Sequence, residues 1–111
     1  MQSSQEIRWI APEVLSGNSC SEDSDVWSYG MTLWEIFNFG MLPYHNCEDK
    51  LQIQREIVSF RLPSMDKMPE RFYRTVKLCC QQHKSVRPNM MFVSKKLKNC
   101  DLQYTPGGTT F

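Results

Sequence analysis

The sequence predicts an all-helical protein, because apolar residues recur at helical spacing along most of the chain. Residues 21–39 carry the strongest of these patterns, and shorter patterns cover residues 48–58, 69–80 and 87–97. No segment alternates apolar and polar residues over the length of a strand, so no sheet is expected. The expected fold class is therefore all-α, with four main helices joined by loops.

Residues 21–39 predict a helix that is apolar on almost every side, as is typical of a helix buried in the middle of a larger structure. Apolar side chains cover most of its surface and leave one narrow polar stripe. The stripe consists of Ser28, Thr32 and Glu35. Ser21 or Ser24 can accept a hydrogen bond from the free N–H groups of the first turn, and Gly40 is expected as the C′ residue.

The segment 48–58 predicts a second, amphipathic helix with Asn46 as its N-cap. Its apolar side is expected to consist of Leu51, Ile53, Ile57 and Val58. Residues 60–69 contain two prolines and show no period, which predicts a connecting loop.

The third helix is expected to have Pro69 at its first position, where the missing N–H has no intrahelical partner to lose. Its buried face is predicted to consist of Phe72, Val76, Cys79 and Cys80. The two cysteines are interpreted as small apolar core residues and not as a redox pair.

Arg87 and Pro88 open the predicted last helix. Its apolar face is expected to consist of Met90, Val93 and Leu97. Residues 1–6 and 99–111 show no periodic pattern and are expected to be disordered, which leaves residues 7–98 as the folded unit.

Charge and composition argue against several classes of function. The net charge is +1 and the basic residues form no run, so neither nucleic acid nor an acidic membrane surface is an expected partner. No apolar stretch approaches the ~20 residues that cross a bilayer, and the first residues lack the apolar part of a secretory signal. The cysteines form no CxxC pair, so reduced thiols in the cytoplasm are expected, without disulfides or a metal site.

Five short motifs occur in the order and approximate spacing of a protein tyrosine kinase. They read IRWIAPEVL from residue 7, SDVWSYGMTLWEI from 24, GMLPY from 40, RLP from 61, and LCC with VRP between 78 and 88. From Ile7 to about Leu97 the sequence thus resembles the second half of the large, helical C-terminal lobe of that family. The resemblance implies a partial lobe, without the N-terminal sheet and the catalytic loop.

Two single positions inside the matched region are informative. Trp9, two residues before Ala11, is similar to the tyrosine kinase form of its segment. Cys80 stands where the family usually has tryptophan. A change from tryptophan to cysteine in a core is expected to leave a volume deficit, worth about 3–5 kcal/mol if nothing repacks.

The resemblance implies three groups of site residues. The loop that holds the substrate residue after the phosphoacceptor tyrosine would consist of Ile7, Arg8, Trp9, Ile10, Ala11 and Pro12. Glu13 would pair with Arg87 and tie that loop to the last helices, as a structural and not a catalytic pair. Asp25 would accept backbone N–H bonds from the catalytic loop; the alternative is an acid that interacts only with the helix dipole.

The sequence lacks the motifs that phosphoryl transfer needs. These are a Gly-rich loop over the phosphates, a strand lysine, a catalytic Asp in His-Arg-Asp and a magnesium-binding Asp in Asp-Phe-Gly. The glycines form no GxGxxG, and no Asp follows His-Arg or precedes Phe-Gly. We therefore expect no catalytic, cofactor-binding or metal-binding residue here and no activity from the chain alone; ATP and Mg²⁺ would belong to the complete family domain.

Two functions from different classes follow. The first is a truncated protein tyrosine kinase domain, from a cytoplasmic kinase or from the cytoplasmic side of a membrane receptor. The second is a non-catalytic, kinase-derived module that binds a protein or peptide partner through Trp9 and the helix at residues 48–58. In both cases the long helix is expected to expose a contiguous apolar face, because segments that precede this region cover it in the family. The chain alone is therefore expected to be poorly folded, loosely packed or held by a partner.

Overall fold

The structure is a computed structural model that describes residues 7–59, 61–64 and 68–95. Every regular element in these ranges is helical, which confirms the predicted all-α class. In chain order the elements are α2 (Pro12–Leu15), α3 (Glu22–Phe37), α4 (Lys50–Val58), α5 (Glu70–Cys79) and the 3₁₀ helix η1 (Lys84–Val86). Residues 90–95 are also helical, whereas Leu97 and the ends predicted to be disordered lie outside the described residues.

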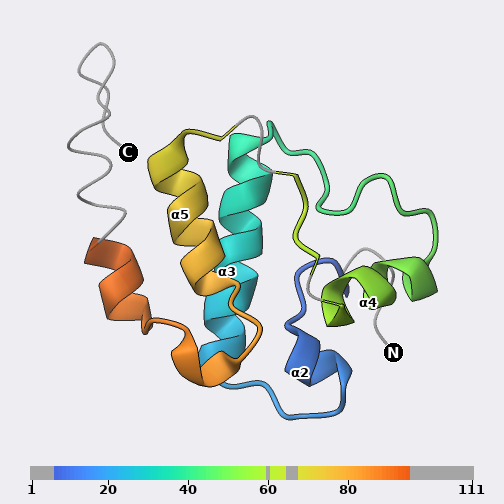
Figure 1. The fold of residues 1–111 in the computed structure, drawn as a ribbon, viewed down its shortest axis with the longest axis horizontal. Coiled ribbons are helices and arrows are strands. Elements are labelled where there is room, and N and C mark those ends of the chain that lie inside the picture. Colours follow the sequence, from blue (N-terminus) through green and yellow to red (C-terminus); the bar gives the residue numbers. More distant parts are fainter. Residues whose placement is uncertain (1–6, 60, 65–67, 96–111) are drawn as a thin grey trace.

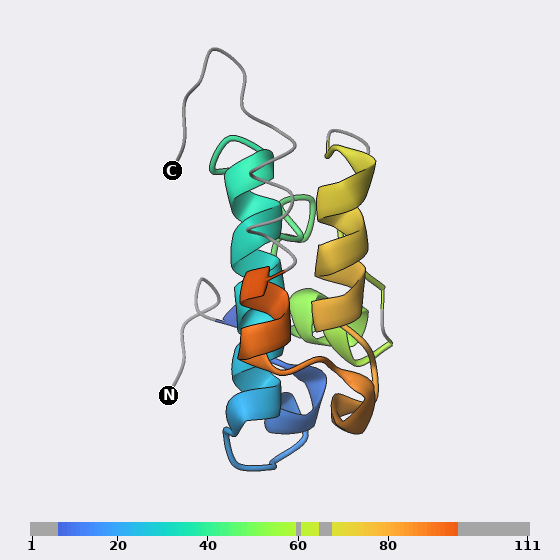
Figure 2. The same ribbon diagram turned by 90° about the vertical axis from the view of Figure 1, so that its left-hand side faces the viewer.

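The two longest helices, α3 and α5, lie side by side and run in opposite directions (Figure 1). They remain adjacent when the molecule is turned (Figure 2), and the short α2 packs against α4. One cluster of buried apolar residues joins these elements. Its largest fully buried side chains include Trp27, Met31, Trp34, Ile53 and Ile57.

Both ends of α3 are closed by local hydrogen bonds. At the start, the Ser21 and Ser24 side chains each accept a bond from the other's backbone N–H, which forms a capping box. At the end, the Gly40 N–H donates to the Glu35 carbonyl at 2.9 Å, as in a Schellman motif. The C′ residue is Phe39, with a φ of +58°, so the prediction of Gly40 at C′ is wrong by one position.

One side of α3 is buried in the described structure and the other is open. The buried residues are Ser24, Val26, Trp27, Gly30, Met31, Leu33 and Trp34. Asp25, Thr32 and Ile36 are exposed on the other side. The exposed side therefore mixes charged, polar and apolar residues, and differs from the continuous apolar face that the sequence suggested.

Helices α3 and α5 meet at Gly30. A Cβ atom added there would lie 2.7 Å from Cys80 Sγ and 2.8 Å from Cys79 Cβ, so a larger residue has no room. Both cysteines are buried free thiols, as predicted. Burial raises the pKa of Cys79 to about 12 and that of Cys80 well above its usual value. The volume deficit expected from cysteine at position 80 is absent at this contact, because α3 approaches Cys80 through a glycine.

Helix α4 begins two residues later than predicted. The Asp49 side chain accepts the Gln52 N–H at 2.8 Å, so Asp49 is the N-cap and the prediction of Asn46 is wrong. The buried residues of α4 are Ile53 and Ile57. Leu51 and Val58, which were predicted on the same side, are exposed by 57% and 50%. The apolar side of α4 is therefore narrower than the sequence pattern indicated.

Helix α5 buries the face that the sequence predicts, with Pro69 as its N-cap and not its first helical residue. Its buried residues are Phe72, Thr75, Val76 and Cys79. Arg87 has an extended backbone after η1, so it lies outside the helix that it was predicted to open. The Asn89 side chain instead accepts the Phe92 N–H at 2.8 Å, at the start of the helical residues 90–95.

Candidate functional site

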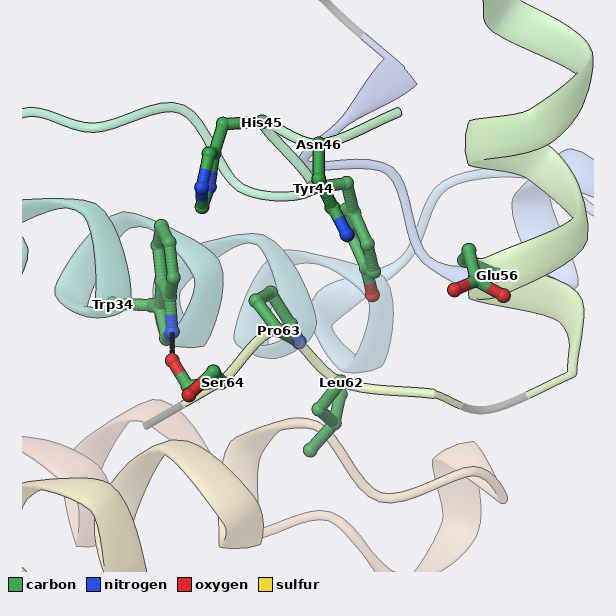
Figure 3. Close-up of a pocket in the computed structure, with 8 residues that line it drawn as sticks. All are labelled: Trp34, Tyr44, His45, Asn46, Glu56, Leu62, Pro63 and Ser64. Carbon is green, nitrogen blue, oxygen red and sulfur yellow. Dashed lines mark hydrogen bonds between the residues drawn. The ribbon is translucent and has the colours of Figure 1, made fainter. Parts of the chain in front are cut away.

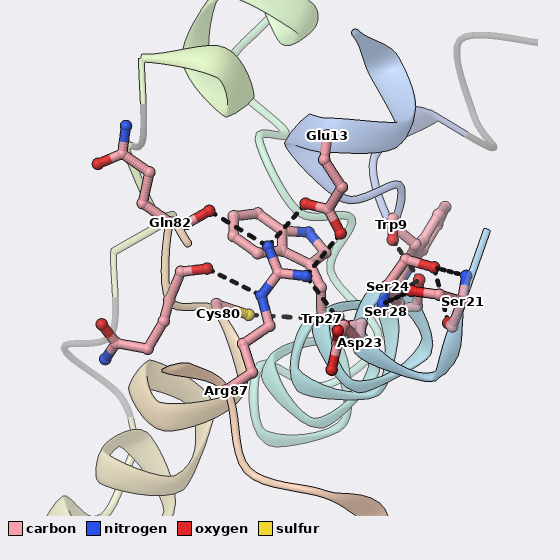
Figure 4. Close-up of polar contacts among 11 residues, drawn as sticks. Trp9, Glu13, Ser21, Asp23, Ser24, Trp27, Ser28, Cys80, Gln82 and Arg87 are labelled. Atoms are coloured by element: carbon pink, nitrogen blue, oxygen red, sulfur yellow. Dashed lines mark hydrogen bonds and ion pairs between the residues drawn. The ribbon is translucent and has the colours of Figure 1, made fainter. Parts of the chain in front are cut away.

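An ion pair between Glu13 and Arg87 joins residues that lie 74 positions apart in the sequence. Two parallel hydrogen bonds form it, from Arg87 Nη1 to Glu13 Oε2 at 2.7 Å and from Arg87 Nη2 to Glu13 Oε1 at 2.8 Å (Figure 4). The exposed fraction of the side chain is 0% for Arg87 and 12% for Glu13. A fork-shaped guanidinium suits this geometry better than a lysine ammonium does.

The Arg87 guanidinium makes further contacts besides those to Glu13. Its Nη1 donates to the Asp23 carbonyl and its Nε to the Gln81 carbonyl, both at 2.9 Å. The guanidinium carbon lies 5.2 Å from the centre of the Trp27 ring, within cation–π distance. Arg87 thus connects the first turn of α2, the first turn of α3 and the segment that follows α5.

The Glu13 carboxyl should make stability depend on pH. Burial alone raises its pKa, but the hydrogen bond from Arg87, a backbone hydrogen bond and the charges of Arg87 and Lys84 outweigh burial and lower it. A depressed folded-state pKa contributes stability above the unfolded value of about 4.3, and this stability is lost as the pH falls through the folded value. Urea unfolding between pH 7 and pH 3 should therefore show the deficit of Glu13→Gln shrinking below about pH 4.3.

The matched control is Glu70→Gln. Glu70 also pairs with an arginine at 2.7 Å, but 65% of its side chain is exposed. We expect this variant to stay close to the unsubstituted chain at every pH, because an exposed pair contributes little. A deficit of Glu13→Gln that is unchanged from pH 7 to pH 3 would contradict the prediction.

The loop formed by residues 7–12 is held by hydrogen bonds at Arg8 and Trp9. The Arg8 side chain is buried, and its Nη1 donates to the Pro43 and Tyr44 carbonyls at 2.7 and 2.8 Å. The Ser28 hydroxyl donates to the Trp9 carbonyl at 2.7 Å (Figure 4). These bonds attach the loop to α3 and to the segment that follows it.

Only half of this loop offers surface to another molecule. Its buried residues are Ile7, Arg8 and Ala11. Trp9, Ile10 and Pro12 are half-buried, so any shelf for a peptide consists of these three side chains. The structure therefore divides the six residues into a structural half and an accessible half, a division that the sequence alone did not indicate.

Asp25 lies apart from the Glu13–Arg87 pair. It is exposed in the first turn of α3, where Glu22 and Asp23 are also acidic. Carboxylates in this position interact favourably with the positive end of the helix dipole. Because the Asp25 side chain is exposed, its carboxylate is also accessible to N–H donors from another segment.

The structure contains a pocket of about 180 Å³ that the sequence did not predict (Figure 3). Its walls come from α3, α4 and the two segments that flank α4. They include Trp34, Tyr44, His45, Glu56, Pro63 and Ser64. Tyr44 has a φ of +59°, which is rare for a large side chain. Two of the family motifs, the Pro-Tyr of GMLPY and the RLP that starts at residue 61, contribute residues to these walls, but neither motif by itself predicts a pocket.

The fold and the ion pair define a class of protein. A helical unit in which the Glu of an Ala-Pro-Glu loop pairs with an Arg that precedes Pro has the arrangement of the large lobe of a protein kinase domain. Within the described residues, no helix is both long and apolar enough to span a bilayer.

Comparison with known proteins identifies the family. Residues 1–97 match the family model described as protein tyrosine and serine/threonine kinase. The chain is 33% identical over 93 residues to human tyrosine-protein kinase FRK, 34% over 91 residues to the tyrosine-protein kinase transforming protein Fps of avian sarcoma virus, and 33% over 91 residues to zebrafish ephrin type-B receptor 4b. These matches cover 84%, 82% and 82% of this chain but only 18%, 17% and 9% of the relatives. The chain belongs to the protein tyrosine and serine/threonine kinase family.

Proposed function

We propose that these residues form the peptide-binding side of a protein tyrosine kinase domain and do not transfer phosphate by themselves. The observation that carries the proposal is the loop at residues 7–12, which presents Trp9, Ile10 and Pro12 while Arg8 and Ser28 hold its backbone. A rigid apolar surface with a proline suits an extended peptide. The loop would contact the substrate residue that follows the phosphoacceptor tyrosine.

Tyrosine is favoured as the acceptor over serine or threonine for two reasons. Trp9 has the form typical of tyrosine kinases at this position. Two of the relatives are also named as tyrosine-protein kinases. The activity of the complete domain would then be ATP-dependent phosphorylation of tyrosine in proteins, in the cytoplasm or on the cytoplasmic side of a membrane receptor.

The chemical step would need residues outside this chain. The sequence contains no phosphate-binding glycine loop, no His-Arg-Asp and no Asp-Phe-Gly, so ATP and Mg²⁺ would bind to another part of the domain. Asp25, exposed at the start of α3, would accept backbone N–H bonds from the catalytic loop of that part. The Glu13–Arg87 pair would keep the peptide loop in position against the helices.

A second candidate is a non-catalytic module that binds a protein partner. The exposed apolar side chains of Leu51 and Val58 on α4 favour it, because apolar side chains that lie close together on a surface often mark an interface. In that case an antibody against the C-terminal residues, CDLQYTPGGTTF, should detect a cellular protein near 13.1 kDa. A much larger protein would favour the kinase domain.

The primary test uses the purified chain and a tyrosine peptide with isoleucine after the tyrosine. We expect weak binding, which falls several-fold when serine replaces that isoleucine or when Trp9 is changed to alanine, and no phosphotyrosine with ATP and Mg²⁺. Ile36→Ala is the control, because Ile36 is an exposed apolar residue that lies outside the loop at residues 7–12. Phosphotyrosine that forms only with the chain present would overturn the catalytic part of the proposal, and equal binding by Trp9→Ala would overturn the binding part.

A further inference from the structure

Helix α4 turns one face to the core and the opposite face to solvent. Its inner residues, Ile53 and Ile57, are 0% exposed. The exposed residues Leu51, Arg55 and Val58 follow one another four and three positions apart, so they form a single stripe along the helix. In Figure 1, α4 lies at the edge of the fold opposite to α5. We call these three residues the outer stripe of α4.

Two apolar side chains form the ends of the outer stripe. Leu51 is exposed by 57% and Val58 by 50%. They lie seven positions apart, which corresponds to two helical turns or about 10 Å along the axis. A partner that covered both side chains would remove their apolar surface from water, which favours association.

A positive charge lies between these two side chains. Within the residues that the structure describes, Arg55 forms no ion pair. The neighbouring Glu56 accepts a hydrogen bond from Arg61 at 3.0 Å instead. Gln52 and Gln54, which border the outer stripe, carry no charge. The charge of Arg55 is therefore available to a carboxylate of another molecule.

Local bonds and buried side chains hold α4 in place. Asp49 caps its first turn, and the Ser59 N–H donates to the Arg55 carbonyl at 2.9 Å at its end. Ile53 and Ile57 fix the inner face in the core, and α2 packs against the helix. A partner would thus meet a surface that is already formed, without the cost of ordering it.

We propose that the outer stripe of α4 binds a helix of a partner protein, one that carries a carboxylate between two apolar residues. The carboxylate would pair with Arg55, and the apolar residues would pack on Leu51 and Val58. A helix fits this stripe because its own side chains recur at the same spacing of three and four residues. The proposal deepens the second candidate function by naming the partner's chemistry, and it rests on that function only for the existence of a cellular partner.

Charge favours an acidic partner over a second copy of this chain. In a two-fold symmetric pair the same surface patch of both copies meets itself. The outer stripe contains no acidic residue, so such a pair would place Arg55 near the Arg55 of the other copy. Like charges at an interface oppose association, whereas a carboxylate in the same place supports it.

The test is an NMR titration of the isotope-labelled chain with an alanine-based helical peptide. The peptide carries two leucines seven residues apart and, between them, glutamates at the two positions that face the same side. We expect saturable shifts of the backbone signals of α4, with a dissociation constant on the order of 1 mM. The same peptide should bind about threefold more weakly with glutamine in place of glutamate, and about tenfold more weakly with lysine.

A reversal of charge in the chain provides the sharpest variant. Arg55→Glu should bind the lysine peptide better than the glutamate peptide, which exchanges the preference of the unsubstituted chain. Lys95→Glu is the matched control, because it changes the net charge equally at an exposed position outside α4 and should keep the original preference. Leu51→Ala should weaken both peptides several-fold, because apolar contact is lost. Unshifted signals of the core indoles report that each variant keeps its fold.

The outcomes separate this surface from the proposed functions. No saturable shift in α4, equal binding of the glutamate and lysine peptides, or an unchanged preference in Arg55→Glu would overturn the proposal. A dimer of the chain that is lost in Leu51→Ala would identify a second copy as the occupant and would also overturn it. Glutamate-peptide binding that persists in Trp9→Ala, or without any binding of the tyrosine peptide, would support the outer stripe independently of the loop at residues 7–12.

Discussion

Replacing the buried Arg87 with methionine is expected to cost about 3–5 kcal/mol of folding free energy, because it removes one partner of a buried ion pair. The change leaves the Glu13 carboxylate partly buried without its cation. It also removes donors to the Asp23 and Gln81 carbonyls, which the guanidinium reaches at 2.9 Å. Urea unfolding at pH 7, followed by circular dichroism, measures the loss.

A second arginine provides the matched control. Arg74 Nη2 lies 2.7 Å from Glu70 Oε1, the same distance as in the Glu13–Arg87 pair, but 70% of the Arg74 side chain is exposed. Arg74→Met should therefore cost about 0–1 kcal/mol. The Glu70–Arg74 pair is exposed and joins two residues of one helix, whereas the Glu13–Arg87 pair is buried and joins distant segments. Similar losses for both arginines would therefore refute the structural role of Arg87.

A double-mutant cycle isolates the pair itself. Arg87→Met and Glu13→Gln should together cost less than the sum of the two single changes, because the second change removes a group that has already lost its partner. Arg87→Lys should recover only part of the stability, since an ammonium cannot make two parallel bonds to a carboxylate.

Enlarging Gly30 should give the second large effect. Gly30→Val is expected to destabilise the chain by about 3 kcal/mol, at the upper end of the usual range for overpacking. The first added carbon would already lie 2.7 Å from Cys80 Sγ and 2.8 Å from Cys79 Cβ, so α3 and α5 would have to separate. Gly30→Ala should cost about 1–2 kcal/mol by the same measurement.

The alanine variant distinguishes packing from helix propensity. In an exposed helix interior, glycine to alanine is stabilising by up to about 1 kcal/mol. A loss of stability in Gly30→Ala therefore has the opposite sign to the propensity effect and reports the contact with α5. Thr32→Ala, at an exposed position on the same helix, should change stability by no more than about 0.5 kcal/mol. A stabilised Gly30→Ala would show that the two helices are not packed as described.

The Glu13–Arg87 pair was predicted from the sequence, but its other hydrogen bonds were not. Neither residue has a local pattern that predicts a partner 74 positions away, and only the resemblance to the kinase family suggested the pair. The structure brings the two side chains together and adds the carbonyls of Asp23 and Gln81, which no sequence pattern indicates. Backbone acceptors are common to all residues, so their use depends on how the chain folds.

Local sequence patterns correctly predicted some features of the helices and failed for others. Ser21 was correctly predicted as a possible cap of α3, because a serine in this position bonds to N–H groups only a few residues away. The prediction failed for α4, where Asp49 and Asn46 are both good caps and only the observed hydrogen bond to Gln52 distinguishes them. Similarly, Leu51 and Val58 match the periodicity of a buried face, but 57% of Leu51 and 50% of Val58 are exposed.

The sequence by itself determined the helical class, the approximate position of each main helix and the kinase family, because periodicity and motif order are local properties of the chain. Tertiary structure alone decided which half of the loop at residues 7–12 is accessible, why position 30 must be glycine, and that Tyr44 and Glu56 share a pocket. These features depend on contacts between segments far apart in the sequence. Their physical basis is the packing of α3 against α5 and of α2 against α4, which no local pattern specifies.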